Sequence, residues 1–450
     1  MRLPRNLWNS NTHDHCPSWL KSGGAPSWSN RAAQARIRLV TLGAVATLVL
    51  GGLVMLGSTT AGASGSPKPI TIGFIGDLTG PAASSFADGP QGAQAAIAEQ
   101  NAKGGVNGHK LKLIVVDDES NPTDNVTASK DLVSKGAFGI VQGSSFGYAD
   151  AVYSHSVGIP ETSDCECGES FFEPTYINMF GMPTSVSSGA EINGILYSNT
   201  VLAQFFKDIG VTKLAGLAYA GSGASAQALQ ELFDAGTKVG GASQCYSNPS
   251  VPFGTVDFTT DVLAIQSAGC NGLMGGFVDA SDIGMAQAIK DSGTNIKQVY
   301  LSGYDSSILS SASATAALQG AYIASPVNFS SPNASSKAML DSLKRYDSSY
   351  TGGIPDLGLW GGYLATEIMI YGLELAGKNP TRTAFITNLR KVSDYTAGGI
   401  LAGPVSFAHL GTPKMLSSVA CSYFMQVKGS KFVVYKNKPI CGPNFSAGKA

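Results

Sequence analysis

Short apolar runs alternate with segments of helical periodicity along most of the chain, and this alternation limits the fold more than any other feature. The first apolar run covers residues 70–75, and the Ala-rich segment 91–101 is predicted to be a helix. Further strands are predicted at 111–116 and 138–141, with a helix at 122–134 between them. Consecutive parallel strands need such crossover helices, and strands that are buried on both faces are continuously apolar. The sequence therefore predicts an α/β fold with parallel sheets flanked by helices.

The same pattern starts again after a break near residue 185. Its predicted elements are a helix at 191–209, strands at 214–218, 272–277 and 298–301, and helices at 224–239, 259–267 and 280–292. Two successive α/β units of this size indicate two similar lobes. Beyond residue 325 the sequence predicts helices at 335–350, 357–376 and 381–392, followed by an antiparallel hairpin.

The first 63 residues have the features of an export signal. Arginines between residues 31 and 38 precede an apolar run at 39–56, and small residues at 61–63 provide a cleavage site for signal peptidase. We predict export with cleavage after Ala63, and hence an extracytoplasmic protein that is secreted or retained at the cell surface. The alternative is that the apolar run remains as a membrane anchor, because about 18 residues are just enough to span a bilayer.

Six cysteines follow this leader, and an even number outside the cytoplasm indicates disulfides. Cys421 and Cys441 flank two apolar runs joined by a Lys-Gly-Ser turn, a hairpin pattern that brings the two cysteines nearly opposite each other. A second bridge is predicted between Cys245 and Cys270, which each lie beside a predicted strand edge. The remaining two are expected either to pair with each other or to stay as free thiols: Cys165 and Cys167.

The charges of the chain are balanced and sparse. Lys and Arg number 30 against 31 Asp and Glu, a net charge of -1, and 14% of the residues are charged. This balance gives no electrostatic reason to expect nucleic acid or an anionic membrane surface as a partner. The 43% of hydrophobic residues exclude general disorder.

A series of short motifs runs through the chain from residue 70 to about 407. The motifs are 76–81 (GDLTGP), 92–93 (GA), 101–108 (NAKGGVNG), 116–118 (VDD), 143–145 (GSS), 158–160 (GIP), 275–277 (GGF) and Trp360. In this order and spacing the chain resembles the branched-chain amino-acid-binding proteins, which are type I periplasmic substrate-binding proteins of ABC transporters. The resemblance implies two lobes joined by three crossings of the chain, a small-molecule ligand between them, a membrane permease as partner, and no cofactor.

On this resemblance the chain divides into a leader at 1–63, a first part of lobe 1 at 64–185 and a first part of lobe 2 at 186–325. Residues 326–404 are expected to return to lobe 1, and the C-terminal hairpin at 405–450 to join lobe 2. The ligand, an amino acid or a related polar solute, is expected to favour the closed state because it contacts both lobes.

Ser144, Ser145 and Phe146 follow a predicted strand of lobe 1 at a turn that begins with glycine. Ligands of open α/β sheets bind at the carboxyl ends of strands, where unpaired N–H groups favour an anion. The resemblance places the carboxylate-binding serine of the family at Ser145 or an adjacent position. An N-cap and turn would explain the same serines without a ligand. The next strand end, which contains Cys165, matches a loop whose backbone contacts the ligand in the family.

A zwitterionic ligand also needs an anion beside its ammonium group, because an unpaired buried charge is costly. Asp305 follows Tyr304 after a predicted strand of lobe 2, where the family places an acid. A helix N-cap is the equal alternative for Asp305. Phe277 matches a family aromatic that covers the ligand, with a core position as the alternative.

Two departures from the family pattern affect the expected cleft. Ser85 beside Phe86 replaces a tyrosine of lobe 1, and a Gly-Ser-Gly turn that includes Gly223 replaces an aromatic of lobe 2. Both changes are expected to enlarge the cleft, so the ligand need not be leucine, isoleucine or valine. The aromatic residues near Trp360 are interpreted as core and hinge packing.

Residues 143–147 also match the G-x-S-x-G pattern of a hydrolase nucleophile elbow. A triad requires a histidine, and the chain after the leader has only His109, His155 and His409. His155 is expected two to three helical turns away from Ser145, and no pattern supports His409. A serine hydrolase and a sensor domain of the same fold are thus the alternatives to a non-catalytic solute-binding protein, which the sequence favours.

Two cofactor patterns are incomplete. Residues 221–226 fit the G-x-G-x-x-G/A dinucleotide pattern, but Gln244 and Cys245 stand where an acid is expected. Cys165, Cys167 and His155 offer too few ligands for a metal site of known type. We therefore expect neither a nucleotide cofactor nor a metal.

Overall fold

The computed structural model describes residues 67–165, 168–182, 190–192 and 195–449. All of them belong to one compact unit, Ser64–Ala450. The predicted leader at 1–63, and its alternative as a membrane anchor, lie outside the described residues. Within the described part, no helix is both long and apolar enough to cross a membrane.

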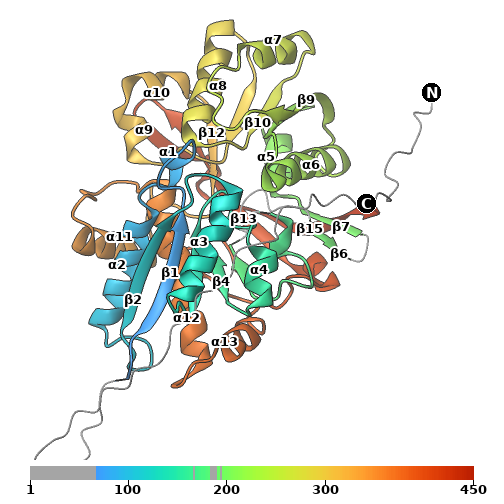
Figure 1. The fold of residues 1–450 in the computed structure, drawn as a ribbon. Coiled ribbons are helices and arrows are strands. Elements are labelled where there is room, and N and C mark those ends of the chain that lie inside the picture. Colours follow the sequence, from blue (N-terminus) through green and yellow to red (C-terminus); the bar gives the residue numbers. More distant parts are fainter. Residues whose placement is uncertain (1–66, 166–167, 183–189, 193–194, 450) are drawn as a thin grey trace, which may run out of the picture. The chain divides into compact units, whose positions relative to one another are not determined.

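The first sheet contains five parallel strands in the order β2-β1-β3-β4-β5 (Figure 1). β1 is buried at nearly every residue, as continuous apolar runs in parallel sheets require. The predicted α/β fold is confirmed. The strands are β1 (Ile70–Gly76), β2 (Leu111–Asp117), β3 (Gly139–Gly143), β4 (Glu161–Ser163) and β5 (Met179–Gly181). The helical segments that precede or connect them are α1 (Ala83–Phe86), α2 (Gly89–Ala102), α3 (Pro122–Ser134), α4 (Ala151–Ser156) and the 3-10 turn η1 (Glu169–Phe171).

The second sheet contains ten strands. Its parallel part has the order β12-β11-β10-β8-β9, and β13 adds to β12 in the antiparallel sense. The strands are β6 (Ala190–Ile192), β7 (Ile195–Asn199), β8 (Lys213–Tyr219), β9 (Ser243–Val251), β10 (Gly272–Gly275), β11 (Lys297–Tyr300), β12 (Tyr322–Ser325), β13 (Val419–Lys428), β14 (Lys431–Val434) and β15 (Ile440–Lys449). The helices between them are α5 (Val201–Asp208), α6 (Gly223–Lys238), α7 (Thr259–Ser267), α8 (Asp279–Ser292), α9 (Ser306–Ser310) and α10 (Ala312–Ala317).

The chain between β12 and β13 is helical. Its helices are α11 (Ala334–Tyr346), α12 (Leu357–Ala376) and α13 (Arg382–Leu389), and short 3-10 turns follow at η2 (Ala397–Gly399), η3 (Pro413–Ser417) and, after β14, η4 (Tyr435–Asn437). The long helix α12 covers the predicted residues because Asp356 caps its start, accepting from Leu359 N at 3.0 Å, and Gly377 follows its end with φ 82°. It packs against α2, β3 and β4 of the first sheet.

The segment 191–209 differs from its prediction. The sequence predicts one helix there, but β6 and β7 occupy its first part and only α5 is helical. β7 pairs in the antiparallel sense with β15 near the C-terminus, with Asn199 opposite Asn444. A pairing over this sequence distance is invisible to local periodicity, so the prediction of a helix was wrong for the first half of the segment.

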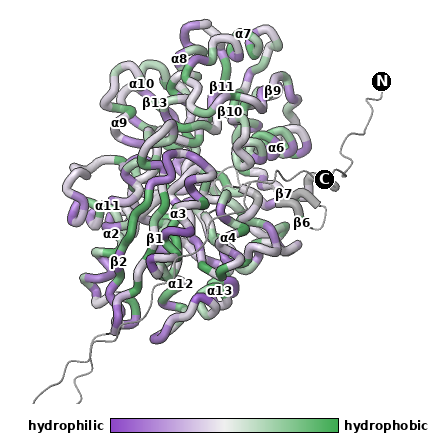
Figure 2. The backbone as a smooth tube through the Cα atoms, viewed as in Figure 1, coloured by the Kyte–Doolittle hydropathy of each residue, from purple (hydrophilic) through white to green (hydrophobic). Residues whose placement is uncertain are grey.

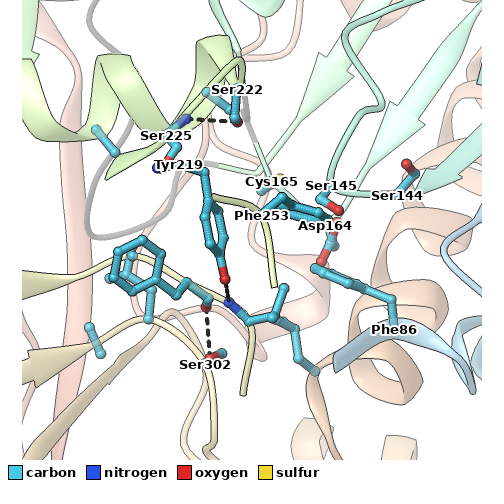
Figure 3. A pocket seen from close by; sticks show the side chains of 18 of the residues that line it. Phe86, Ser144, Ser145, Asp164, Cys165, Tyr219, Ser222, Ser225, Phe253 and Ser302 are labelled. Carbon is cyan, nitrogen blue, oxygen red and sulfur yellow. Dashed lines mark hydrogen bonds between the residues drawn. The ribbon is translucent and has the colours of Figure 1, made fainter. Parts of the chain in front are cut away.

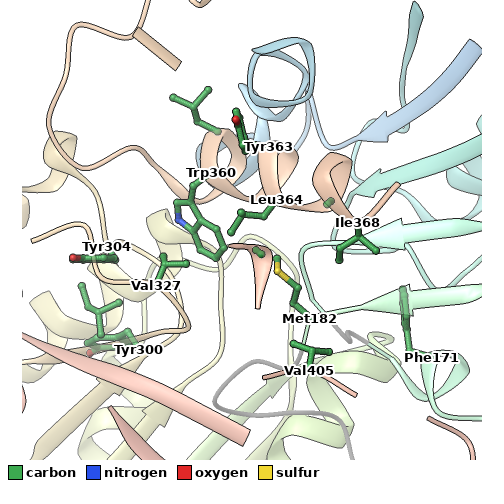
Figure 4. Close-up of a cluster of buried hydrophobic side chains, with 14 of the residues drawn as sticks. Phe171, Met182, Tyr300, Tyr304, Val327, Trp360, Tyr363, Leu364, Ile368 and Val405 are labelled. Atoms are coloured by element: carbon green, nitrogen blue, oxygen red, sulfur yellow. The ribbon is translucent and has the colours of Figure 1, made fainter. Parts of the chain in front are cut away.

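The strands and α12 form the hydrophobic interior. Figure 2 shows β1 and β2 largely in the hydrophobic colour. In one buried cluster, Trp360, Leu364 and Ile368 of α12 lie with Met182 and Val405, and each of these side chains is at most 5% exposed (Figure 4). The cluster joins α12 to segments that are distant in sequence.

Both predicted disulfides are present. Cys421 and Cys441 face each other in the antiparallel pairing of β13 with β15. The second bridge joins Cys245 on β9 to Cys270, which follows α7. The expectation for Cys165 and Cys167 lies partly outside the described residues, since Cys167 is not among them.

Removal of the Cys421–Cys441 bridge is expected to lower the free energy of unfolding by about 3 kcal/mol, because the bridge restricts the unfolded chain over a separation of 20 residues. The measurement is urea unfolding of Cys421→Ala/Cys441→Ala beside the wild-type protein, both oxidised. Cys245→Ala/Cys270→Ala provides a matched pair with a separation of 25 residues. An unchanged urea midpoint in the first variant would contradict the expectation.

Candidate functional site

A pocket lies where the carboxyl ends of strands from both sheets meet. From the first sheet it is reached by residues after β3 and β4, and from the second by residues after β8, β10, β11 and β12. The empty space is about 1100 Å³, including the part that is open to solvent. Its lining consists of Phe86, Ser144, Ser145, Asp164, Cys165, Tyr219, Ser222, Ala224, Ser225, Ala228, Phe253, Gly276, Phe277, Val278, Leu301, Ser302, Ala324, Pro326, Leu357 and Trp360. This is the place where α/β sheets bind ligands.

The two serines after β3 belong to a buried network of acids. Ser145 donates to Asp77 Oδ2 twice, from its backbone N at 2.7 Å and from Oγ at 2.5 Å. Ser144 Oγ donates to Asp118 Oδ2 at 2.5 Å and accepts from Phe146 N at 2.9 Å. Asp77 and Asp118 follow β1 and β2, so parallel pairing with β3 brings these side chains together.

Burial first, and the negative charge of Asp118 second, raise the pKa of Asp77 to about 8, although the two hydrogen bonds from Ser145 oppose the shift. The donors that the sequence assigned to a ligand carboxylate are therefore already used by a carboxyl group of the protein. Asp77 occupies the position at Ser145 where an anion was expected. The structure does not leave this anion site open.

A second acid of the first sheet faces the pocket directly. Asp164 follows β4 and is 6% exposed. Burial raises its pKa to about 6, while hydrogen bonds from Ser163 and from its own backbone N–H oppose the shift. Figure 3 shows Asp164, Ser145 and Phe86 on one side of the pocket, with Tyr219 and Ser302 on the other.

Aromatic rings make up much of the remaining lining. The ring centroids of Tyr219 lie 4.6 Å from Phe253 and 4.5 Å from Phe277, and Phe86 and Trp360 line the pocket from the first-sheet side. Tyr219 OH donates to Ser281 Oγ at 2.8 Å, which fixes its ring. The site combines an apolar aromatic surface with a few acids and hydroxyl groups, as small-molecule pockets do.

The polar groups of the second sheet are mostly engaged within the protein. Ser222 caps α6 by accepting from Ser225 N at 3.2 Å. Ser302 Oγ donates to Phe277 O at 3.0 Å and to Asp282 Oδ2 at 2.8 Å. Burial raises the pKa of Asp282 well above its usual range. These bonds hold the strand ends that shape the pocket.

Half of the ligand-binding residues named from the sequence line the pocket: Phe86, Ser144, Ser145, Cys165 and Phe277. The others do not. Ser85 Oγ accepts from Asp279 N at 2.9 Å, Gly223 N donates to Tyr148 OH at 3.1 Å, and Phe146 packs on Phe253 with centroids 5.3 Å apart. Tyr304 OH bonds with Ser330.

Asp305 is a helix cap outside the residues that line the pocket. Its Oδ1 accepts from Ser307 N at 2.6 Å and from Ile308 N at 3.0 Å, so it caps α9. The side chain is 2% exposed and does not line the pocket. Of the two roles that the sequence left open, the structure shows the N-cap.

Sequence reasoning missed several lining residues. Tyr219 directly precedes the segment where the family aromatic was sought, and Phe253 lies in a loop after β9. Together they supply aromatic rings that the glycines at 221–223 lack. Trp360 was interpreted as packing, but it both packs and lines the pocket. Asp164 carried a usable signal, since it is an acid that directly follows a strand end.

The residues that a serine hydrolase or a metal site would need do not lie together in the described part of the chain. Ser145, the centre of the G-x-S-x-G pattern, donates to Asp77, and the three histidines bond or pack elsewhere. His109 contacts Lys68 O and Lys378 O, His155 packs on Tyr176, and His409 Nδ1 lies 2.9 Å from Ser418 Oγ. Within the described residues no cluster of three or more potential metal ligands occurs.

The fold and the pocket together define a ligand-binding protein with the type I periplasmic fold. Residues 69–431 match the family model described as periplasmic binding protein. The chain therefore belongs to the periplasmic binding protein family, which confirms the resemblance carried by the sequence motifs and places the protein outside the cytoplasm.

Curated relatives agree with this assignment. The chain is similar to Leu/Ile/Val-binding protein homolog 1 of Brucella abortus, with 24% identity over 350 residues that cover 77% of this chain and 88% of the relative. It is also similar to Leu/Ile/Val-binding protein BraC3 of Rhizobium johnstonii, with 43% identity over 67 residues. That shorter match spans 15% of this chain and 18% of the relative.

Solved structures share the fold. The fatty acid ABC transporter substrate-binding protein from Thermomonospora curvata aligns with a TM-score of 0.66 at 20% identity, over 82% of this chain and 91% of that one. A solute-binding protein of an ABC transporter from R. palustris, solved in complex with benzoate, aligns with a TM-score of 0.65 at 17% identity, over 85% and 97%. At these identities the likeness concerns the fold.

Proposed function

We propose that the protein is the extracytoplasmic solute-binding protein of an ABC importer and captures a small amino acid or a related solute in this pocket. The observation that carries the proposal is that the strand ends of two α/β sheets line one pocket of suitable size. Membership of the periplasmic binding protein family and the names of the curated relatives support it. The domain boundaries at 185, 325 and 404 remain part of the proposal.

The proposed mechanism is capture by closure of the two lobes. Hydrogen bonds already join the segments around the second sheet to those around the first. Asp279 N donates to Ser85 Oγ at 2.9 Å, and Gly223 N donates to Tyr148 OH at 3.1 Å. A ligand that contacts both sides adds interactions that only the closed state offers, so it shifts the population towards that state. A membrane permease would then recognise the closed form.

The expected affinity sets how much binding free energy the contacts in the pocket must provide. A dissociation constant of ~1 µM corresponds to about 8 kcal/mol. One charge-assisted hydrogen bond contributes about 1.5–3 kcal/mol, and burial of apolar surface among the aromatic rings contributes about 25 cal/mol for each Å². These terms are large enough for an apolar solute with one or two polar groups.

Ligand binding is expected to raise the melting temperature and to change tryptophan fluorescence. At a ligand concentration of about 100 times Kd, the native state gains about 2.7 kcal/mol, which raises Tm by about 4 °C. Trp360 lines the pocket, and the other three tryptophans lie within residues 1–63, so the form cleaved after Ala63 has Trp360 as its single reporter. The measurement is a thermal-shift screen of amino acids, amines, amides and small carboxylates, followed by fluorescence titration of each hit.

Trp360→Phe is the control for the optical signal, because it removes the reporter while the thermal shift still reports binding. If no solute of these classes raised Tm, or if a hit were chemically consumed by the purified protein, the proposal would be wrong.

A further inference from the structure

Asp164 is a buried acid that forms no ion pair with any of the described residues. Its Oδ1 accepts a hydrogen bond from Ser163 Oγ at 3.3 Å. Its carboxylate lies against α12, where a methyl group added to Gly361 would be 2.6 Å from Oδ2. In the described part of the chain, no Lys, Arg or His forms an ion pair with Asp164.

This arrangement is unfavourable for the empty protein. The pKa of Asp164 is raised to about 6 by burial, with no contribution from a neighbouring charge, so the group is ionised at pH 7.5 in spite of its burial. A buried carboxylate without a counter-ion is costly, and a cation that enters the pocket removes that cost. Asp164 therefore favours a positively charged ligand group.

The rest of the pocket lining has few groups that could stabilise an anionic ligand. No Lys, Arg or His is among the residues that line the described pocket. The Ser145 donors that would serve a carboxylate are bonded to Asp77, and the Ser302 hydroxyl donates to Phe277 O and Asp282. A ligand carboxylate placed beside Ser145 or Ser302 would therefore meet donors that are already bonded to other groups of the protein.

Aromatic rings of the same pocket can contact both the ammonium group and the apolar body of an amine. Phe86, Phe253 and Trp360 line the same pocket. A cation over an aromatic face is stabilised by the ring quadrupole, and an apolar body gains from leaving water among these rings. The carboxylate and the rings thus favour the same kind of ligand.

We propose that Asp164 holds the ammonium group of the ligand, so that the pocket takes primary amines with an apolar body, amino acids among them, and does not take the matched carboxylic acids. The inference rests on the proposed function and assigns the ammonium to the first sheet instead of to Asp305 of the second. It also separates this protein from the two structural neighbours named above, a fatty acid ABC transporter substrate-binding protein and a solute-binding protein in complex with benzoate.

The test is calorimetric titration of the full chain at pH 7.5 with two matched ligand series. The first is 3-methylbutylamine, leucine and 4-methylpentanoate, and the second is phenethylamine, phenylalanine and 3-phenylpropanoate. In at least one series the amine or the amino acid is expected to bind at least about 30-fold more tightly than the acid, the factor that one charge-assisted bond of about 2 kcal/mol provides.

Three variants assign the effect to a residue. Asp164→Asn is expected to weaken the amine and the amino acid about 30-fold, because it keeps the shape and removes the charge. Gly361→Ala keeps the charge but places a methyl group beside Oδ2, and it is expected to weaken the same ligands. Asp261→Asn is the matched control, since Asp261 bonds with Tyr246 and Asn248 and does not line the pocket.

The outcomes separate this inference from the proposed function. Tighter binding of the acids, or unchanged amine affinity in Asp164→Asn, would overturn the role of Asp164 while the pocket remained a solute site. If Asp305→Asn weakened amine binding and Asp164→Asn did not, the ammonium site would be assigned to Asp305 of the second sheet. Wild-type protein that bound no member of either series would refute the inference, even if Asp164→Asn failed to fold.

Discussion

Gly92→Ala is expected to lower the free energy of unfolding by about 3 kcal/mol, although alanine is the better helix former. Gly92 lies within α2, where intrinsic propensity alone would favour alanine by about 1 kcal/mol. A Cβ at this position, however, would lie 2.0 Å from Leu359 O and 2.8 Å from Tyr363 N of α12. These are backbone atoms, so the two helices have to separate, and overpacking of this kind costs about 1–3 kcal/mol or more.

Urea unfolding of Gly92→Ala and of two companions tests this expectation. Gly362→Ala presents the reciprocal contact, because its Cβ would lie 2.1 Å from Gly89 O, and a similar loss is expected. Gln94→Ala lies on the exposed face of α2 and is expected to change the stability by less than about 0.5 kcal/mol. A stabilised Gly92→Ala protein would show that the close approach of α2 and α12 does not exist.

Stability is expected to fall as the pH rises from 5 to 8, and the acid network behind Ser145 accounts for much of the loss. The pKa of Asp77 is raised from 3.8 to about 8, first by burial and second by the charge of Asp118. Between these two values the unfolded chain has lost the proton while the folded protein keeps it. The folded state then binds more protons, so stability decreases with pH by about 1.4 kcal/mol for each pH unit, or about 4 kcal/mol over this range.

The direction is the same for other buried acids. The pKa is raised to about 6 for Asp164 and to about 7 for Asp279 and Glu367, in each case first by burial. Each of these acids also lowers the free energy of unfolding as the pH rises, and its effect stops once the pH passes its own folded-state pKa. The free energy of unfolding is therefore expected to be larger at pH 5 than at pH 8.

Asp77→Asn isolates the contribution of the network. Asparagine keeps an acceptor for Ser145 N but cannot ionise, so the variant is expected to lose most of the 4 kcal/mol dependence attributed to Asp77, about 1.4 kcal/mol for each pH unit. The measurement is urea unfolding at pH 5, 6.5 and 8. Asp291→Asn, at an exposed position at the end of α8, is the control. An equal slope in wild type and Asp77→Asn would contradict the buried location of this acid.

The comparison of sequence and structure shows where local patterns suffice. α12 covers the predicted residues 357–376, because an Asp cap, a continuous apolar face and a terminal glycine are all features of adjacent residues. The strands β1, β2 and β3 follow from short apolar runs for the same reason. The cysteine pair at β13 and β15 follows from turn chemistry between two apolar runs.

Local patterns failed where partners come from far along the chain. β6 and β7 form strands because β15 pairs with β7 over more than 240 residues, as at Asn199 and Asn444. Ser145 was expected to serve a ligand, but its donors go to Asp77, which is 68 residues away. For Asp305, local patterns left a ligand contact and a helix N-cap as equal alternatives, and the structure shows the N-cap.

The sequence by itself determined the fold class, the family, both described disulfides and the strand ends at which the pocket forms. These features depend on periodicity, capping and motif order, which neighbouring residues express. The tertiary structure alone decided which polar groups at those strand ends remain available. That depends on which donors and acids the parallel pairing of β1, β2 and β3 brings together. It also depends on which carboxylate faces the pocket without an ion pair to the described residues, and this carboxylate is Asp164.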